Sequence, residues 1–248
     1  MLLPARSDRR PGGLRQRAKI VLRWPIGLTA IAFRYVWRIT PVYRVDEVGG
    51  PDDMPPPLPE GVERESLQTP EQGYGTLLHR RYAVWIKGAQ VGPEDAVTHL
   101  AADPNHATPV DAAVFVKTAG EPGEMRVGDE YVVRMPGPWD GPVQVIARTA
   151  TSIRFATLHG HLEAGQIEFR ARRVNEGECE GLHFEIESWA RPGDRLSHLL
   201  YNRLLLAKEI QLNLWTETCL GVVRGSGGRL VGGVRVHTRR VDEPVPES

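Results

Sequence analysis

The side chains best suited to chemistry lie in one short segment, His159-Gly160-His161-Leu162-Glu163. Residues two apart on a strand point to the same side, so His159, His161 and Glu163 could converge as metal ligands. Alternatively, Glu163 could orient the imidazole of His161, which titrates near neutral pH, for general acid and base catalysis. Gly160 and Gly165 indicate a strand end or turn, where the same groups serve as structural hydrogen-bond partners. Because no further ligand cluster is evident, we expect no metal and no cofactor, and the structural role is favoured.

Two hydroxyl groups and one guanidinium group extend this candidate site. Thr157 and Ser188 share strand faces with otherwise apolar residues, and a buried polar atom left without a partner costs ~1–3 kcal/mol. A polar ligand, ordered water or neighbouring backbone would supply that partner. Arg191 could hold a ligand carboxylate or phosphate at a pocket mouth, or pair with a nearby glutamate. The candidate ligand-binding residues are therefore His161, Glu163, Thr157, Ser188 and Arg191, and no catalytic residue is assigned.

Motifs of the common enzyme classes are absent from the sequence. It contains no G-x-S-x-G, no G-x-x-x-x-G-K-[ST], no H-E-x-x-H and no C-x-x-C. The two cysteines, Cys179 and Cys219, exclude a disulfide scaffold, and reduced thiols in the cytoplasm are the default. The composition, with 41% hydrophobic and 25% charged residues, is that of a globular protein. The sequence favours a binding protein over an enzyme.

The elements that would position these residues are strands with a two-residue period. From Leu77 onward apolar and polar residues alternate, and after a short helix predicted to start at Pro93 six further runs follow. Such alternation predicts strands with one buried face, and the short Gly/Pro/Asp-rich connections favour an antiparallel meander. The six runs span residues 110–118, 130–136, 143–149, 152–158, 165–174 and 181–190.

A long helix is predicted after the last strand. Asp194 is a plausible N-cap, and apolar residues at helical spacing continue for about 25 residues to Gly221. One strand, a short helix, six strands and a terminal helix is the order of the helix-grip fold. The expected fold is thus α+β, a curved antiparallel sheet of about seven strands wrapped on the helix, with an apolar gap between them. After Gly221, the alternation of Val234, Val236 and Thr238 suggests an added edge strand.

The chain also resembles an uncharacterised bacterial and plant family in the START and polyketide-cyclase-like superfamily. The resemblance lies in Thr157-Leu158, Gly160-His161, Glu163, Gly165, Phe169 and Arg191-Pro192. Leu162 stands where the family pattern has proline, and Gln166 and Ile167 replace two glutamates. The resemblance covers roughly residues 75–220 and implies a helix-grip fold without implying a reaction.

The N-terminal part differs in charge from the rest. Residues 1–44 carry ten basic side chains and one acidic side chain, whereas the whole chain has 31 of each. The longest uncharged run, Trp24 to Phe33, would reach only about 15 Å as a helix, too short for a membrane span. The expected organisation is a basic helical arm over residues 1–50, a proline-rich linker over 51–70, a helix-grip domain over 71–221 and a basic, partly disordered tail over 222–248.

Three functions remain open on the sequence. The first is binding or carriage of a small apolar molecule or lipid between sheet and helix. The second is a cyclase- or hydrolase-type enzyme that uses His161 and Glu163. The third is a peripheral membrane or scaffold protein that contacts an anionic membrane surface through residues 1–44, with nucleic acid the less favoured partner. The expected compartment is the cytoplasm, with or without membrane association, and neither the ligand nor the oligomeric state follows from the sequence.

Overall fold

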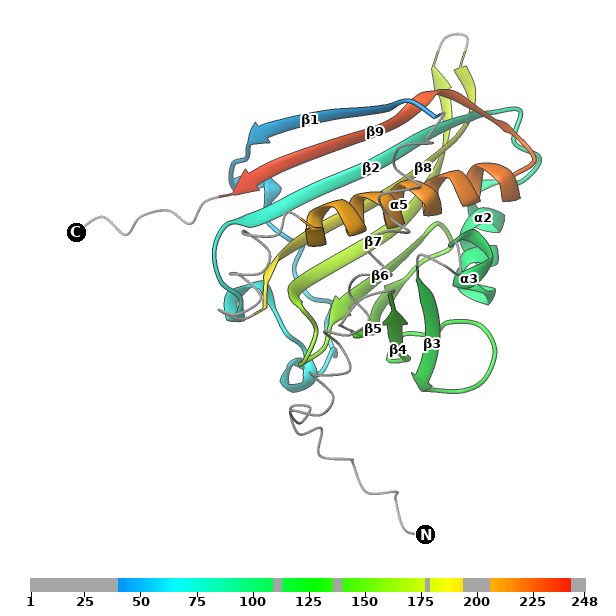
Figure 1. Cartoon of the computed structure of the whole chain (residues 1–248). Coiled ribbons are helices and arrows are strands. Elements are labelled where there is room, and N and C mark those ends of the chain that lie inside the picture. Colours follow the sequence, from blue (N-terminus) through cyan, green and yellow to red (C-terminus); the bar gives the residue numbers. More distant parts are fainter. Residues whose placement is uncertain (1–39, 109–112, 136–139, 177–178, 194–205, 242–248) are drawn as a thin grey trace.

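The structure is a computed structural model that describes residues 40–108, 113–135, 140–176, 179–193 and 206–241 (Figure 1). These residues form one nine-stranded sheet with α-helices on one face and short 3₁₀ helices in the N-terminal part. The strands are β1 (Val42–Val48), β2 (Leu77–Lys87), β3 (Val114–Ala119), β4 (Glu130–Arg134), β5 (Asp140–Arg148), β6 (Ser152–Thr157), β7 (Glu163–Glu176), β8 (Cys179–Pro192) and β9 (Arg229–Val241). The helices are α2 (Pro93–Ala102), α3 (Pro104–Ala107), α5 (Leu206–Gly225), η1 (Pro51–Asp53), η2 (Arg64–Ser66) and η3 (Pro70–Gln72).

The sheet has the strand order β1-β9-β2-β8-β7-β6-β5-β4-β3. Strands β3 to β8 form the expected antiparallel meander, and each predicted run contains a strand. The predictions of about seven strands and of a purely antiparallel sheet are wrong. Nine strands are present in the described residues, and β1 pairs with β9 in parallel.

The two additional strands come from the expected arm and tail. β1 escaped detection because only its first residue is partly buried, so no alternation between buried and exposed positions marks it. β9 is not an edge strand, since it lies between β1 and β2. The sheet therefore draws on more of the chain than the domain boundaries 71–221 include.

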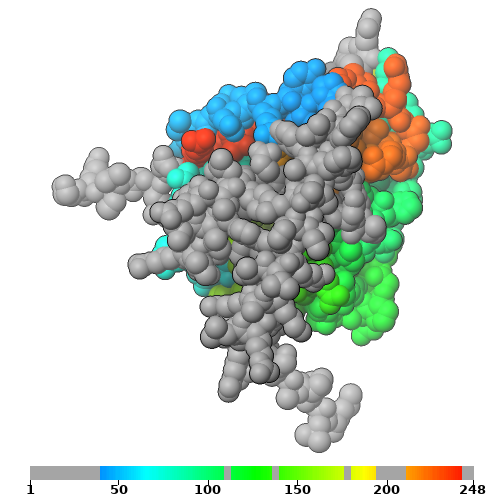
Figure 2. All heavy atoms as spheres, in the orientation of Figure 1, coloured from blue at the N-terminus to red at the C-terminus, as the bar shows by residue number. Residues whose placement is uncertain are grey.

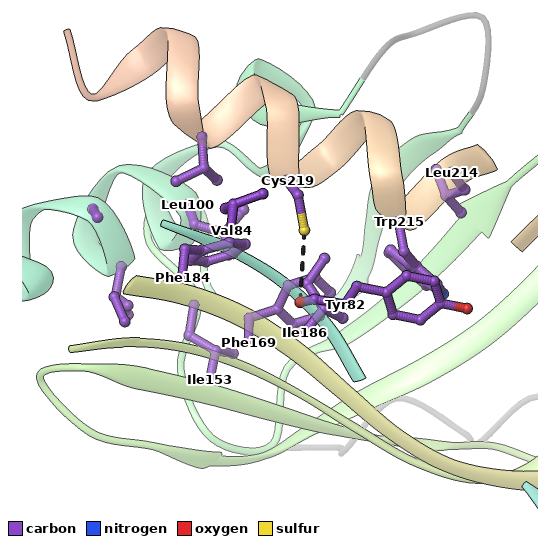
Figure 3. Packing of buried hydrophobic residues seen from close by; sticks show 14 of the residues in the cluster. Tyr82, Val84, Leu100, Ile153, Phe169, Phe184, Ile186, Leu214, Trp215 and Cys219 are labelled. Carbon is purple, nitrogen blue, oxygen red and sulfur yellow. Dashed lines mark hydrogen bonds between the residues drawn. The ribbon is translucent and has the colours of Figure 1, made fainter. Parts of the chain in front are cut away.

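Helix α5 packs against the concave face of the sheet and forms the main core with it. Leu214, Trp215 and Cys219 project from α5 toward strand residues that include Tyr82 and Phe184 (Figure 3). β-bulges in the β2–β9, β3–β4 and β5–β6 pairs bend the strands, and β3 and β4 run in a direction clearly different from β1 and β9 (Figure 1). Residues 194–205 of the predicted helix lie outside the described residues.

The convex face of the sheet is covered by the chain between β1 and β2. Leu67 is fully buried against Ile146, Ala156 and Leu158, and it forms an isolated bridge with Leu158. The stretch expected as a proline-rich linker therefore lies against the sheet. Both faces of the central strands are consequently buried, which fixes which side chains point toward α5 and which point toward residues 50–76.

Candidate functional site

A cavity lies between the sheet and α5, where the sequence predicted a gap. The described residues around it enclose about 70 Å³. Its walls are mostly apolar, and polar groups gather where β6 turns into β7. The lining residues that matter here are Phe155, Phe169, Leu214 and Trp215 on the apolar side and His161, Glu163, Ser188 and Gln211 on the polar side.

His161 stands in the turn between β6 and β7, where Gly160 has a φ of +94°. Nδ1 of His161 lies 2.9 Å from the backbone N of Glu163 and 3.0 Å from its carbonyl oxygen, so Nδ1 accepts from the first or donates to the second according to the tautomer. The half-buried ring lies over Gly141 of β5, where a Cβ atom would come within 2.8 Å of Nε2. Burial lowers the pKa of His161, against the opposing effect of the Glu163 carboxylate. Nε2, the other ring nitrogen, donates or accepts in the neutral ring according to the same tautomer.

Glu163 takes part in a polar chain that crosses from the sheet to α5. Nε2 of Gln211 donates to Oε2 of Glu163, and Nη1 of Arg80 donates to Oε1 of Gln211 at 2.6 Å. Arg80 and Glu163 are both buried, with 6% and 7% of their surfaces exposed, so the amide of Gln211 links two opposite charges in the core. The Glu163 carboxylate is thus engaged by α5 and has no hydrogen bond to the His161 ring.

The two hydroxyl groups of the candidate site differ in their partners. Oγ1 of Thr157 donates to the carbonyl of Gln68 at 2.8 Å and accepts from the N–H of Gly165 at 2.9 Å. The hydrogen bonds of this hydroxyl group are made to the backbone, so Thr157 has a structural role. Among the described residues no hydrogen bond reaches Oγ of Ser188 or Nε2 of His161. These two atoms are the groups on the cavity wall that are available to a ligand.

Arg191 does not line this cavity. Successive residues of a strand alternate between faces, so Ser188 on β8 faces α5 whereas Arg191, three residues later, faces the convex side. There its buried side chain packs against Gly73, whose Cβ atom would lie 2.5 Å from Cγ of Arg191. The proposed place of Arg191 at the pocket mouth is therefore wrong.

The three residues of the His-x-His-x-Glu segment do not converge. Residues 159–162 form a turn rather than a strand, and Nε2 of His159 contacts the backbone carbonyl of Glu65 at 3.1 Å. Within the described residues no group of three His, Cys, Asp or Glu side chains is arranged to hold a metal ion. Cys219 is fully buried, and burial raises the pKa of its thiol, which makes it unreactive.

Arg80 and Gln211 are site residues that sequence reasoning missed. The sequence could have indicated Arg80, because Leu78, Tyr82 and Val84 show that its face of the strand is otherwise apolar. The sequence could not have indicated Gln211, since glutamine is common on helix surfaces and its partners lie 48 and 131 residues away in the chain.

Two larger hollows occur elsewhere in the described structure. One of about 320 Å³ lies between α2, α3 and the C-terminal half of α5, and one of about 490 Å³ lies near the β7–β8 connection beside Lys87 and Arg173. Neither contains a residue of the predicted site. We place the candidate site at the smaller cavity because it lies between the sheet and α5 and is lined by four of the five predicted site residues, Thr157, His161, Glu163 and Ser188.

A sheet with one helix packed across its concave face, and a cavity between the two, defines the helix-grip class. The chain belongs to the family described as "Domain of unknown function (DUF1990)", whose model matches residues 70–213. That match begins at η3 and ends within α5, so it includes neither β1 nor β9. No curated protein matches the chain.

Two solved structures show distant likeness. Major latex-like protein 151 from Panax ginseng is 18% identical over 56% of this chain and 99% of its own, with a TM-score of 0.35. DR_A0006 from Deinococcus radiodurans is 11% identical over 57% of this chain and 96% of its own, with a TM-score of 0.32. TM-scores this low carry no argument about function. In the part of the chain that the structure describes, none of the helices combines the length and apolarity of a membrane span.

Proposed function

We propose that the cavity between the sheet and α5 binds a small, mainly apolar molecule or the end of a lipid, and that the ligand presents one hydrogen-bonding group to the His161–Ser188 side. The carrying observation is the pairing of an apolar wall with two polar atoms that have no partner among the described residues. Nε2 of His161 donates or accepts according to the tautomer, and Oγ of Ser188 can donate or accept. A hydroxyl group of the ligand suits either tautomer, and a carbonyl, ether or carboxylate oxygen suits the tautomer in which Nε2 carries the proton.

The volume of the cavity limits the size of the group that can enter it. About 70 Å³ accommodates two ordered water molecules at ~30 Å³ each, whereas drug-sized ligands occupy pockets of ~300–1,000 Å³. In this conformation the cavity therefore receives a few heavy atoms of one end of the ligand. A larger buried group requires α5 to move away from the sheet, which would strain the polar chain from Arg80 through Gln211 to Glu163.

The enzyme alternative receives less support from the same geometry. General acid or base catalysis by His161 calls for a carboxylate that orients and charges the ring. Here Nδ1 of His161 contacts the backbone of Glu163, while the Glu163 carboxylate is bonded to Gln211. The arrangement favours recognition of an oxygen atom over transfer of a proton.

Proton–nitrogen NMR titrations of the full chain with p-cresol and with hexanoate test the proposal. We expect chemical-shift changes centred on residues that face the cavity, notably Ser188, Ala190 and Trp215. Ala190→Leu fills the cavity and should weaken binding at least tenfold. Ser188→Ala should weaken it about fivefold, because one neutral hydrogen bond contributes about 1 kcal/mol.

The matched control is Ala102→Leu, which enlarges an alanine beside the hollow between α2 and α5. It should leave the titrations unchanged. If neither probe shifts the cavity residues at its solubility limit, or if Ala102→Leu weakens binding and Ala190→Leu does not, the cavity is not the binding site.

A further inference from the structure

In the part of the chain that the structure describes, strand β1 forms an open edge of the sheet. It ends the strand order, and it carries three of the six exposed large apolar side chains of the described residues, Tyr43, Val45 and Val48, at 56%, 39% and 85% exposure. Figure 2 shows β1, in blue, at the rim of the molecule. Natural edge strands are commonly protected by charged side chains, especially lysine, by proline or by a bulge, and of these β1 has the charged residues Arg44, Asp46 and Glu47. Between Val42 and Val48 there is no lysine and no proline, and the register with β9 runs without a bulge.

The backbone groups on this edge follow from the pairing with β9. The carbonyl of Pro41 accepts from the N–H of Val234, and the N–H of Gly49 donates to the carbonyl of Arg240. In a parallel pair alternate residues bond to the neighbouring strand, so the odd-numbered residues of β1 face β9. The even-numbered residues, Val42, Arg44, Asp46 and Val48, therefore direct their N–H and C=O groups outward.

The side chains of β1 are complementary to a second copy of the same strand. In an antiparallel pair centred on Val45, the outward residues meet one another, Val42 opposite Val48 and Arg44 opposite Asp46. Even-numbered residues thus occupy all the hydrogen-bonded positions, as the backbone requires, and about eight inter-strand hydrogen bonds form. On the other face Val45 meets its own copy, and Tyr43 meets Glu47.

The charged residues of β1 also favour the register centred on Val45. Each Arg44 lies opposite an Asp46 of the second copy, and opposite charges in a directly opposed pair contribute roughly 0.2–1 kcal/mol. Arg44 already has an interaction within its own chain, and its guanidinium group, with five donors, can serve a second partner. A shift of the register by two residues would remove both the charge pairing and the valine pairing.

We propose that β1 is a homodimer interface, in which two chains pair antiparallel about Val45 and form one continuous sheet. A two-fold axis perpendicular to the sheet relates the chains, so both copies of α5 and both ligand cavities lie on the same side. A single pair of seven-residue strands is a small interface. We therefore expect a weak dimer, which forms when the concentration of the chain reaches roughly tens of micromolar.

Disulfide trapping tests the register directly. In a full chain in which Cys179 is replaced by serine, Val45→Cys places two thiols opposite each other at a non-hydrogen-bonded position, where Cα atoms lie about 4.5 Å apart. Oxidation should yield a covalent dimer. Glu47→Cys is the matched control, because its two copies would lie about 13 Å apart and should not cross-link. Equal cross-linking at both positions would overturn the proposed register.

Sedimentation velocity on the full chain tests the charge pairs. Arg44→Asp alone and Asp46→Arg alone each oppose like charges and should raise the dimer dissociation constant at least tenfold. The double variant Arg44→Asp/Asp46→Arg exchanges the charges and should restore dimerisation to within about threefold, a rescue that a merely structural role would not produce. A monomer at 200 µM of unaltered chain (roughly ten times the concentration at which we expect dimer), or a dimer that both single variants leave intact, would refute the proposal.

Discussion

His79 is held between two buried carboxylates on the convex face. Its Nδ1 lies 2.7 Å from Oδ1 of Asp53 and its Nε2 lies 2.7 Å from Oε1 of Glu187, while its ring stacks on Trp189. An ionised carboxylate only accepts, so a ring nitrogen that carries a proton donates to the carboxylate beside it. This contact ties η1, at the start of the segment that covers the convex face, to strands β2 and β8.

The carboxylates are held in their ionised form despite their burial. Burial by itself would raise the pKa of Asp53, but hydrogen bonds from the Gly50 N–H, Arg239 and His79 outweigh it and lower the pKa to about 2. Likewise, burial would raise the pKa of Glu187, but hydrogen bonds from His79 and Arg81 lower it to about 2. Both groups bind protons less readily in the folded than in the unfolded chain, so their contribution to stability is complete above about pH 4.5 and is lost as the pH falls toward 2.

Replacing His79 should show how the stability contributed by these two carboxylates depends on pH. His79→Leu leaves two buried, ionised carboxylates without the ring that both contact, and we expect the free energy of unfolding at pH 7 to fall by about 3–5 kcal/mol. The loss should shrink at pH 3, where protonation of the carboxylates relieves their repulsion. Urea unfolding at both pH values measures it. His99→Leu, on the exposed side of α2, is the control and should change stability little; an equal loss in both variants would contradict the interpretation.

At the scale of elements, α5 is placed by a close contact with α3. A Cβ atom on Gly221 would lie 1.8 Å from the backbone carbonyl of Ala107, so only glycine allows the two helices to approach this far. Oγ1 atoms of Thr108 and Thr218 lie 3.3 Å apart beside this contact. The position of α5 over the cavity therefore depends on one glycine in the helix interior.

Because of this contact, replacing Gly221 with alanine should change stability in the direction opposite to the usual effect of this substitution in a helix. Glycine to alanine in a helix interior ordinarily stabilises by roughly 0.5–1 kcal/mol. Gly221→Ala should instead destabilise, by roughly 1–3 kcal/mol, because overpacking displaces α3. Gly225, the last residue of the same helix, has open space where a Cβ atom would stand, with no neighbour within 4 Å, and Gly225→Ala should be neutral or stabilising. Thermal unfolding of the two variants distinguishes them, and a stabilised Gly221→Ala would show that the helices are not in close contact.

At the scale of the whole molecule, the sheet takes in both ends of the described chain. β1 pairs with β9 and β9 pairs with β2, so residues 42–48 cannot be removed without uncovering β9. The basic arm can thus be separated from the sheet only before Val42. Residues 1–39 contain nine basic and one acidic side chain, which keeps most of the charge asymmetry in that segment.

We expect this segment to bind anionic membranes, and its removal tests that. In co-sedimentation, the full chain should bind vesicles of phosphatidylserine and phosphatidylcholine, and a chain lacking residues 1–39 should lose most of that binding. Raising the salt concentration should weaken the interaction, because exposed charges are screened beyond about 8 Å at physiological ionic strength. Equal binding by both chains, or binding to pure phosphatidylcholine that salt does not change, would contradict the expectation.

In the region from β6 to β8, the sequence predicts the strands and the turn, but it does not predict the hydrogen bonds that link them to α5. The alternation in residues 165–174 and 181–190 predicted strands that are present, and Gly160 predicted the turn that aims His161 at the cavity. The same alternation, followed strictly, would have placed Arg191 on the convex face. The polar chain from Arg80 through Gln211 to Glu163 could not be predicted, because its members meet only when α5 docks on the sheet.

By itself the amino-acid sequence determined the meander of strands, the short helix at Pro93 and the turn at His159–Leu162, because local periodicity and glycine placement reflect how each segment is buried. Only the tertiary structure decided that β1 is a strand, since an exposed edge strand has no buried face to pattern its residues, and that β9 lies inside the sheet rather than at its edge. It also decided the volume of the cavity and the partners of its polar groups, because these depend on how side chains distant in the chain pack against one another.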